Sequence, residues 1–477
     1  MKLKELLIGL QIQESNVNME LEIPAVAYDS RKVTPGGMFV AITGFATDGN
    51  RFIPMVLEKG AAVVVTAHRP EGDVPYVLVE SDRKALAQIG ANFYGHPAES
   101  MTMVGITGTN GKTSSTLLLK HILETVQGAK VGLIGTMENL IGQEVLPTER
   151  TTPESFELQA LFARMRDSGC THVVMEVSSH AIALDRVGTV RYDVAAFTNL
   201  SADHLDFHET MENYCDTKAD LFRRSGRAVM NCDDPWFARM RTGVTCPVLT
   251  TSVSGTAGLY AKNVDMRADG VCFTAVYGEQ TAEVKLPIPG KFTVYNALTV
   301  LGLALQLGIG LEQAAAALLT AKGVKGRVEV VPTPGKPYTV LIDYAHTPDG
   351  LENVLSSVRD FCKGRLIAVF GCGGDRDRTK RPVMGRIGVE LADIAIITSD
   401  NPRTEDPAAI IQDILAGTGD SKNQVVVENR VQAIQYAMDI GQKDDIIVLA
   451  GKGHETYQEI CGVKHHMDER EIVAQFL

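Results

Sequence analysis

The stretch Gly105-Ile-Thr-Gly-Thr-Asn-Gly-Lys-Thr113 decides the fold that we expect for this chain. It overlaps the apolar run Met103-Val-Gly-Ile-Thr107 and leads into a helical pattern over residues 114–126. A strand that passes through a glycine-rich turn into a helix directs backbone N–H groups and the helix N-terminus at a phosphate. Lys112 adds a point charge, and the Thr113 hydroxyl can reach a magnesium ion. The predicted nucleotide-binding residues are Gly108, Thr109, Asn110, Gly111, Lys112 and Thr113.

The spacing of this loop departs from the most common phosphate-binding pattern. Position 106 is isoleucine where that pattern has a glycine, so a purely structural turn remains an alternative reading of the loop alone. The chain has no Asn-Lys-x-Asp segment of the kind that reads guanine. The sequence therefore predicts a nucleotide site that prefers ATP to GTP.

Apolar strand-like runs alternate with helical patterns along the whole chain, which is typical of an α/β fold with parallel sheets. At 477 residues the chain is too long for one core. We expect three domains in series: a small α/β domain over residues 1–97, a central P-loop parallel-sheet ATPase domain over 98–328, and a Rossmann-like α/β domain over 329–477.

The charge balance limits the partners that this protein can have. Asp and Glu number 58 against 46 Lys and Arg, and the net charge of −12 disfavours broad attraction to nucleic acid or to an anionic membrane. The N-terminal apolar run is too short for a signal peptide, and no apolar stretch reaches the ~20 residues of a membrane span. We therefore expect a cytoplasmic protein without nucleic-acid or membrane partners, in which anionic ligands are held by local basic clusters.

Further polar segments follow other predicted strands. Glu176-Val-Ser-Ser-His180 and Asp203-His-Leu-Asp-Phe-His208 bring carboxylates and imidazoles to strand ends, where they could serve a magnesium site. A structural role is the alternative for each of them alone. The turn Gly371-Cys-Gly-Gly-Asp-Arg376 lacks the third glycine of a dinucleotide fingerprint, but it begins a basic run through Arg381 that is either a solvated face or an anion site.

The segment Thr398-Ser-Asp-Asn-Pro-Arg-Thr-Glu-Asp-Pro407 follows the apolar run that ends at Ile397. Asp-Asn-Pro is good turn chemistry, and an arginine in such a loop is commonly solvated. Arg403 nevertheless stands just beyond a strand end, where open α/β sheets bind ligands. On its own this segment leaves both interpretations open.

Taken together, these segments resemble the Mur ligases, ATP-dependent enzymes that form amide bonds in peptidoglycan precursors. Within the family the chain is most similar to the branch that adds the third residue to UDP-N-acetylmuramoyl-L-alanyl-D-glutamate. The resemblance covers nearly the whole chain and rests on Asp29-Ser-Arg31, Pro35-Gly-Gly-Met-Phe-Val40, Gly108-Thr-Asn-Gly-Lys-Thr113, Glu176-Val-Ser-Ser-His180, Asn199-Leu-Ser-Ala-Asp-His-Leu-Asp206, Tyr295-Asn296, Gly326-Arg327, Asp343-Tyr-Ala-His-Thr-Pro348 and Gly451-Lys-Gly-His-Glu455.

The resemblance implies a site assembled from several segments. ATP and magnesium are the expected co-substrate and cofactor, with Lys112, Glu176, His204 and Lys218 as catalytic residues. Lys218 matches a lysine that the family carries as a carbamate, and the expected metal-binding residues are Thr113, Glu176, His204 and Lys218. Positions near the adenine, ribose and phosphates are matched by Asn296, Arg327, Asp343 and His346. The UDP-sugar-dipeptide is expected at Tyr28, Ser30, Thr151, Thr152, Ser178 and Arg186.

The same resemblance assigns meso-diaminopimelate as the incoming amino acid. A guanidinium grips a carboxylate through two parallel hydrogen bonds, and diaminopimelate has a distal carboxylate that lysine lacks. Arg403 is therefore expected to hold that carboxylate, with Asp400 and Asn401 available to the distal ammonium. The full expected set is Arg376, Asp400, Asn401, Pro402, Arg403, Gly451 and Glu455. Leu184 and Thr293 depart from polar positions found in some relatives and are not assigned a role.

The implied reaction passes through an acyl phosphate on the D-glutamate γ-carboxylate, which the amine then attacks, and we expect a monomeric enzyme. Three alternatives remain at this stage. A lysine-adding ligase would differ in its amino-acid preference. A folylpolyglutamate synthetase is disfavoured by the Asp29-Ser-Arg31 segment and by the diaminopimelate motif. A nucleotide-binding regulator would show no substrate-dependent phosphate release.

Overall fold

The computed structural model describes residues 1–44, 47–148 and 150–477. Residues 1–251 with 299–309 form one compact unit, and residues 252–298 with 310–477 form a second. The predicted α/β class is confirmed, and the strand predicted before the glycine-rich turn is β6, Thr102–Thr107. The expected domain boundaries after residues 97 and 328 stay a prediction.

The first unit opens with a five-stranded sheet in the order β1-β5-β4-β3-β2. Strands β2 to β5 pair in parallel, and β1 joins β5 antiparallel. The strands are β1 Ile12–Ser15, β2 Val26–Ala27, β3 Met38–Val40, β4 Val63–Thr66 and β5 Tyr76–Val79, and the helices are α1 Leu3–Leu6, α2 Ile53–Glu58 and α3 Asp82–Phe93 with the 3₁₀ turns η1 Gly49–Phe52 and η2 Pro97–Ser100.

The rest of the first unit contains strands in the order β13-β12-β11-β6-β10-β7-β8-β9. Neighbours from β13 to β7 run parallel, and β8 and β9 add antiparallel strands. Because parallel strands end at one edge, the loops after β6, β10 and β11 meet there. The remaining elements are β7 Val131–Ile134, β8 Asn139–Ile141, β9 Glu144–Leu146, β10 His172–Glu176, β11 Tyr192–Phe197, β12 Ser225–Asn231, β13 Val248–Ser252, α4 Lys112–Gln127, α5 Ser155–Asp167, α6 Ser179–Ala183, α7 Leu205–His208, α8 Met211–Arg223 and α9 Phe237–Met240.

The second unit contains an antiparallel meander, β14-β15-β16, and a six-stranded sheet in the order β17-β18-β22-β19-β20-β21. Strands β18 to β21 of that sheet pair in parallel, and β17 is antiparallel. The elements are β14 Leu259–Arg267, β15 Gly270–Tyr277, β16 Gln280–Leu286, α10 Lys291–Gln306, which continues into the first unit, α11 Leu311–Leu318, β17 Glu329–Val331, β18 Thr339–Asp343, α12 Pro348–Arg359, β19 Leu366–Phe370, α13 Lys380–Leu391, β20 Ile394–Ile397, α14 Pro407–Leu415, β21 Gln424–Val426, α15 Arg430–Ile440, β22 Ile446–Ala450, the ribbon β23 Tyr457–Ile460 with β24 Val463–His466, and α16 Glu469–Gln475.

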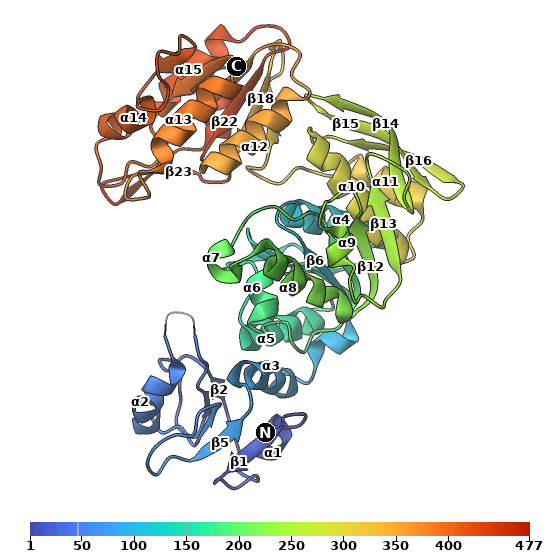
Figure 1. The fold of residues 1–477 in the computed structure, drawn as a ribbon, viewed down its shortest axis with the longest axis vertical. Coiled ribbons are helices and arrows are strands. Elements are labelled where there is room, and N and C mark those ends of the chain that lie inside the picture. Colours follow the sequence, from blue (N-terminus) through green and yellow to red (C-terminus); the bar gives the residue numbers. More distant parts are fainter. Residues whose placement is uncertain (45–46, 149) are drawn as a thin grey trace. The chain divides into compact units, whose positions relative to one another are not determined.

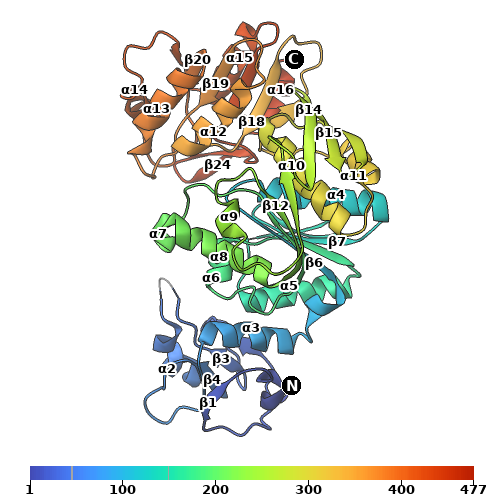
Figure 2. The ribbon, with the colours of Figure 1, turned by 45° about the vertical axis from the view of Figure 1, so that its right-hand side comes forward.

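Alternation along the buried strands gives the six-stranded sheet a core on each face. Leu341 and Val448 face one core, whereas their neighbours Ile342 and Leu449 face the other. Helices α12, α13 and α14 lie side by side over the first face (Figures 1 and 2). Helices α15 and α16 cover the second face. Strands buried on both faces explain the continuous apolar runs that the sequence shows at these positions.

No helix in the described ranges is long and apolar enough to span a bilayer.

A buried ion pair joins the first residues of α15 and α16. The Arg430 Nε donates to Glu469 Oε1 at 2.8 Å, and its NH2 donates to the Ala450 carbonyl at 2.9 Å. Both charged side chains are at most 1% exposed, so each depends on the other for a countercharge.

Breaking this pair should destabilise the second unit strongly. Substitution R430M leaves the Glu469 carboxylate buried without a countercharge, which costs about 3–5 kcal/mol of unfolding free energy, whereas R430M/E469L removes both charges and should recover most of the loss. The loss of unfolding free energy is measured by denaturant unfolding, with hydrogen exchange of the amides in α15 and α16 as the probe. The exposed Arg359–Asp393 pair is the control, and R359M should cost less than ~1 kcal/mol. Equal losses in R430M and R430M/E469L would contradict the interpretation.

Candidate functional site

The predicted phosphate loop joins β6 to α4 and contains two glycines with left-handed backbone. Gly108 has a φ of 146° and Gly111 a φ of 84°, which residues with a Cβ rarely adopt. A Cβ on Gly108 would also lie 1.9 Å from the Thr198 Oγ1 atom, so the chain after β11 can approach only a glycine. The Lys112 Nζ folds over the loop and donates to the Gly108 and Thr109 carbonyl oxygens at 3.0 and 2.8 Å. A positive charge therefore stands at the N-terminus of a helix, where anions are favoured.

The segment after β11 fixes the loop in place. The Thr109 N–H donates to the Asn199 carbonyl at 2.8 Å, and the Asn110 N–H donates to the Asn199 side-chain oxygen at 2.9 Å. The Thr198 hydroxyl donates to the Asn110 carbonyl at 2.7 Å. Asn199 thus orients the phosphate loop, a role that its place in the sequence did not reveal.

Glu176, at the end of β10, lies beside the first turn of α4. It is 1% exposed. Its Oε1 accepts hydrogen bonds from the Thr113 hydroxyl and the Thr136 N–H, both at 2.9 Å, and its Oε2 accepts from the Thr136 hydroxyl at 3.0 Å. Carboxylate and hydroxyl oxygens are the donors that Mg²⁺ prefers. Thr113 and Glu176 therefore fit the predicted magnesium site, and Thr136 is a neighbour that sequence spacing missed.

Lys218, on α8, is sealed against the other side of the phosphate loop. Its side chain is about 1% exposed, and its Nζ donates to the Gly108 carbonyl at 3.1 Å and lies 4.6 Å from the centre of the Tyr214 ring. Burial, and secondly the charge of Lys112, hold the pKa of Lys218 well below its usual range. In the described part of the chain no carboxylate pairs with Lys218 within 4.0 Å. A neutral amine is the form that reacts with carbon dioxide, and a lowered pKa favours that form.

His204 lies in a group of histidine rings that contact one another edge-on. Its backbone is left-handed, with a φ of 54°, and its exposed ring meets the His180 ring edge-on at 4.8 Å. His208 is buried, bonds the Ser179 hydroxyl at 2.9 Å, and has a pKa lowered to about 4 by burial. Among the residues described, no three His, Cys, Asp or Glu side chains are grouped to hold a metal. The metal-ligand roles of His204 and Lys218 stay predictions.

A cavity of about 970 Å³ in the first unit contains two of the residues predicted for the UDP end of the substrate. Tyr28 and Ser30 line it. The pKa of Tyr28 is raised, mainly by burial and to a smaller extent by a hydrogen bond with Glu157. The cavity also has the basic side chains Arg31, Lys32 and Arg150, which the sequence analysis did not assign to it. Local cations in an acidic protein are suited to a diphosphate.

Thr152, Ser178 and Arg186 come together at the start of α6. The Thr152 hydroxyl donates to the Glu176 carbonyl at 2.9 Å and accepts from the Ser178 N–H at 3.2 Å. Arg186 donates to the Thr152 carbonyl at 3.2 Å and pairs with Glu154 at 3.3 Å. Thr151 lies nearby, with its hydroxyl 3.0 Å from that of Thr136. Three of the predicted dipeptide residues therefore form one hydrogen-bonded group, and Thr151 is linked to the Glu176 carboxylate through Thr136.

In the second unit, Arg327, Asp343 and His346 surround Tyr344. The Asp343 carboxylate is buried and accepts from the Val328 and Ala345 N–H groups, each at 2.8 Å, and burial raises its pKa. The Arg327 guanidinium lies 5.5 Å from the centre of the Tyr344 ring, and the His346 Nδ1 is 2.9 Å from the Tyr344 carbonyl. These three predicted nucleotide residues form one group. Asn296 is buried in α10, and its nucleotide role stays a prediction.

The residues predicted for diaminopimelate gather where β19, β20 and β22 end. Asn401 Nδ2 donates to Glu455 Oε2 at 2.9 Å, and a Cβ on Gly451 would lie 2.5 Å from Asp400 Oδ2. Arg403 is tied down: its NH1 donates to the Gly374 carbonyl at 2.7 Å, and its Nε lies 3.4 Å from Glu459 Oε2. Its side chain is 21% exposed, so the solvated-loop alternative is wrong for Arg403.

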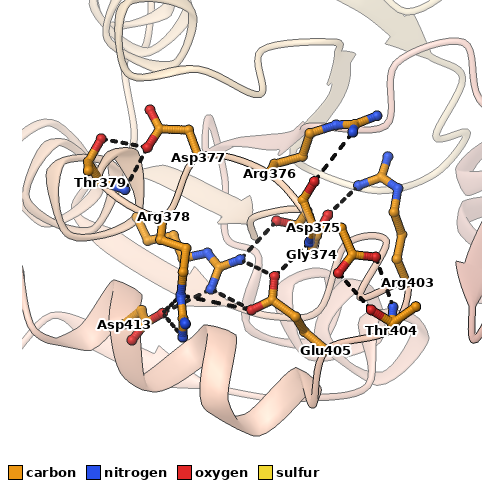
Figure 3. A network of polar contacts seen from close by, with 12 residues as sticks. Gly374, Asp375, Arg376, Asp377, Arg378, Thr379, Arg403, Thr404, Glu405 and Asp413 are labelled. Atoms are coloured by element: carbon orange, nitrogen blue, oxygen red, sulfur yellow. Dashed lines mark hydrogen bonds and ion pairs between the residues drawn. The ribbon is translucent and has the colours of Figure 1, made fainter.

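A network of ion pairs fastens the loop after β19 to the loop after β20 (Figure 3). Arg381 is 0% exposed and donates to both Glu405 oxygens and to Asp413. Glu405 also accepts from the Asp375 N–H at 2.6 Å, and Arg381, followed by this bond, lowers the pKa of Glu405 to about 2. The solvated-face alternative for the basic run is therefore wrong for Arg381, whereas Arg376 is exposed. Arg376 and Arg403 belong to the same network in Figure 3, and a Cβ on Gly373 would lie 2.9 Å from the Arg403 NH1 and 4.0 Å from the Arg376 Cγ.

Comparison with known proteins covers the whole chain. Three family profiles match in series: Mur ligase family, catalytic domain, over residues 22–94; Mur ligase middle domain over 106–304; and Mur ligase, glutamate ligase domain, over 326–453. This order agrees with the three predicted α/β parts.

Curated relatives match over their full length. Proteins named UDP-N-acetylmuramoyl-L-alanyl-D-glutamate--2,6-diaminopimelate ligase are 46% identical in Clostridium tetani (100% of this chain, 99% of the relative) and 48% identical in Caldanaerobacter subterraneus subsp. tengcongensis (100% and 99%). A solved structure of a ligase with that name is 31% identical, with a TM-score of 0.78 over 100% of this chain and 98% of the other. A folylpolyglutamate synthase from Mycobacterium tuberculosis shares only the fold, at 17% identity and a TM-score of 0.61 over 77% of this chain and 92% of the other. The chain belongs to the Mur ligase family.

Proposed function

We propose that this protein uses ATP to add meso-2,6-diaminopimelate to the γ-carboxylate of the D-glutamate in UDP-N-acetylmuramoyl-L-alanyl-D-glutamate. The observation that carries the proposal is the cluster at the strand ends of the second unit. It combines a fixed guanidinium, Arg403, with the buried carboxylate of Asp400 and the partly buried carboxylate of Glu455. A carboxylate beside an ammonium, as at the distal end of diaminopimelate, matches that pair of charges.

The chemistry proposed for the first unit is transfer of a phosphoryl group. A γ-carboxylate oxygen of the D-glutamate attacks the γ-phosphorus of ATP, ADP leaves, and an acyl phosphate forms. Lys112 and the N-terminus of α4 offset the negative charge that gathers on the phosphates. The diaminopimelate amine then attacks the acyl carbon, and inorganic phosphate leaves as the amide forms. Most of the catalysis is positioning and charge stabilisation.

Magnesium is proposed at Thr113 and Glu176, with His204 and a carbamate on Lys218 as further members of the site. When bound, the ion would neutralise phosphate charge and orient the reacting oxygens. A carbamate would convert Lys218 from a cation to an oxygen donor that suits a hard ion. Tyr28 and Ser30 are proposed to hold the uridine nucleotide, with Thr151, Thr152, Ser178 and Arg186 around the sugar and dipeptide. We also infer a monomer whose domains meet near residues 97 and 328.

The direct test is phosphate release by the purified protein with ATP, magnesium and the uridine-linked dipeptide, with different amino acids. We expect meso-diaminopimelate to exceed L-lysine by roughly two orders of magnitude in kcat/KM, because lysine has no distal carboxylate for the Arg403 guanidinium to bind. A preference for lysine would favour the lysine-adding alternative. Turnover of a folate with glutamate would favour the folylpolyglutamate alternative, and no substrate-dependent release would favour a regulator.

Substitution R403A should reduce kcat/KM for meso-diaminopimelate by roughly 100-fold and leave that for L-lysine nearly unchanged, because only the distal carboxylate loses its partner. R403K keeps the positive charge but cannot form the two parallel hydrogen bonds, so its kcat/KM for meso-diaminopimelate should lie between those of R403A and the unsubstituted protein. The control is R359A, which alters an exposed arginine in the same unit. Equal losses with both amino acids in R403A would show that Arg403 supports the fold and does not read the carboxylate.

Carbamylation of Lys218 should give a carbamate signal in the carbon NMR spectrum of protein equilibrated with ¹³C-bicarbonate. K218M should lose the signal and most of the activity. Lys120 provides a matched control, since it is also buried but pairs with Glu124 at 2.6 Å, so K120M should keep the signal. Full activity of the unsubstituted protein without any carbamate signal would contradict this assignment.

A further inference from the structure

Lys452 lies at the centre of the residues predicted for the incoming amino acid, although sequence analysis gave it no role. Its side chain is 0% exposed. The Nζ donates to Asn401 Oδ1 at 2.5 Å and to Glu455 Oε2 at 3.2 Å, and it lies 3.7 Å from Asp400 Oδ1. One internal ammonium therefore contacts three members of the predicted amino-acid site.

The backbone on both sides of Lys452 holds the side chain inward. Gly451 has a φ of 117° and Gly453 a φ of 55°. A Cβ on Gly453 would lie 2.5 Å from the Tyr344 Cβ, and one on Gly451 would lie 2.5 Å from the Asp400 carboxylate. The chain can turn this closely around Lys452 only with glycine at both neighbours. The position of the ammonium is thus set by the backbone.

The charges around Lys452 leave one negative charge unmatched. Arg430 lies beside Glu469 and Arg403 lies beside Glu459, so each of these two cations has a carboxylate neighbour other than Asp400 and Glu455. Asp400 and Glu455 then share the single ammonium of Lys452. Two carboxylates and one lysine carry a net charge of about −1, which one further ammonium would neutralise.

Lys452 also orients the side-chain amide of Asn401, because its ammonium binds the Oδ1 atom. The Asn401 Oδ1 accepts from the Lys452 ammonium and from the Glu459 N–H at 2.9 Å, so both of its lone pairs are engaged. The Asn401 Nδ2 donates one hydrogen to Glu455, which leaves its second hydrogen for a ligand. Asn401 is therefore suited to donate to a carboxylate. The expectation that it accepts from the distal ammonium needs correction, since Asp400 and Glu455 have the free oxygen capacity for that role.

We propose that Lys452 is a positioning residue for the amino-acid substrate, acting as an internal countercharge that leaves room for a single ammonium and orients Asn401 as a donor. The proposal rests on the proposed function and deepens it.

Substitution K452M, which keeps the length of the side chain and removes its charge, should raise KM for meso-diaminopimelate by roughly 30-fold. KM for ATP and for the uridine-linked dipeptide should stay within about threefold of the unsubstituted values, because those sites do not use Lys452. The control is K464M: Lys464 is exposed and lies 4.1 Å from the centre of the Tyr457 ring, whose centre is 5.5 Å from the Lys452 Nζ. K464M should leave every KM unchanged.

Chemical rescue separates charge from packing. In K452A, added propylammonium replaces the deleted part of the side chain and should lower KM for meso-diaminopimelate, whereas propanol should not. Equal rescue by both compounds would overturn the countercharge role, as would an unchanged KM for meso-diaminopimelate in K452M.

A measurement on the unsubstituted protein covers the case in which these variants do not fold. With ¹⁵N-labelled lysine, the ammonium signal of Lys452, assigned through its displacement in Y457L, should shift when meso-diaminopimelate binds and stay in place when ATP alone binds. No shift with meso-diaminopimelate would overturn the proposal. The proposed function and the role of Lys452 can be refuted separately. Absence of diaminopimelate-dependent phosphate release by the unsubstituted protein would refute the proposed function, whereas the results above concern only Lys452.

Discussion

The geometry of the site depends on charged side chains that are buried inside each unit and need fixed partners. Removing a charged side chain from water costs several kcal/mol unless fixed partners replace the water. Here the partners come from other segments, so every buried charge also ties one loop to another. Glu176 joins the first turn of α4 to the chain after β7, and Arg381 joins the loops after β19 and β20. The strand ends, which would otherwise be mobile loops, are therefore held rigid where ligands bind.

The two units offer different kinds of polar groups to a ligand. In the first unit the polar groups are backbone N–H groups, hydroxyls and single cations around Gly108 and Glu176, an arrangement that suits phosphates and a hard metal ion. In the second unit one cluster holds charges of both signs, with Arg403 beside Glu459 and with Asp400 and Glu455 beside Lys452. A ligand with both signs of charge can be matched there only in one orientation.

The sequence was sufficient for the α/β class and for the phosphate loop, because buried parallel strands are continuous apolar runs and the loop follows one of them directly. It did not predict the antiparallel strands β14, β15 and β16, which lie within residues expected to form a parallel sheet. The strand expected before the glycine-rich turn is β6, and the helix expected over residues 114–126 is α4, Lys112–Gln127. Burial of individual charges could not be predicted. Arg381 and Arg376 stand in the same basic run, yet one is sealed and the other exposed, because Glu405 and Asp413 reach only Arg381. Lys452 was missed for the same reason, since its partners include residues about fifty positions earlier in the chain.

Arg403 adopts a φ of 50°, in the left-handed region that an arginine enters at a cost of about 1 kcal/mol. Glycine or asparagine would relieve that backbone cost, but either would give up the hydrogen bond to Gly374 and the ion pair with Glu459. The left-handed backbone at position 403 is therefore compensated by the contacts of the arginine itself. A side chain with a Cβ and no guanidinium would bear the same cost without that compensation.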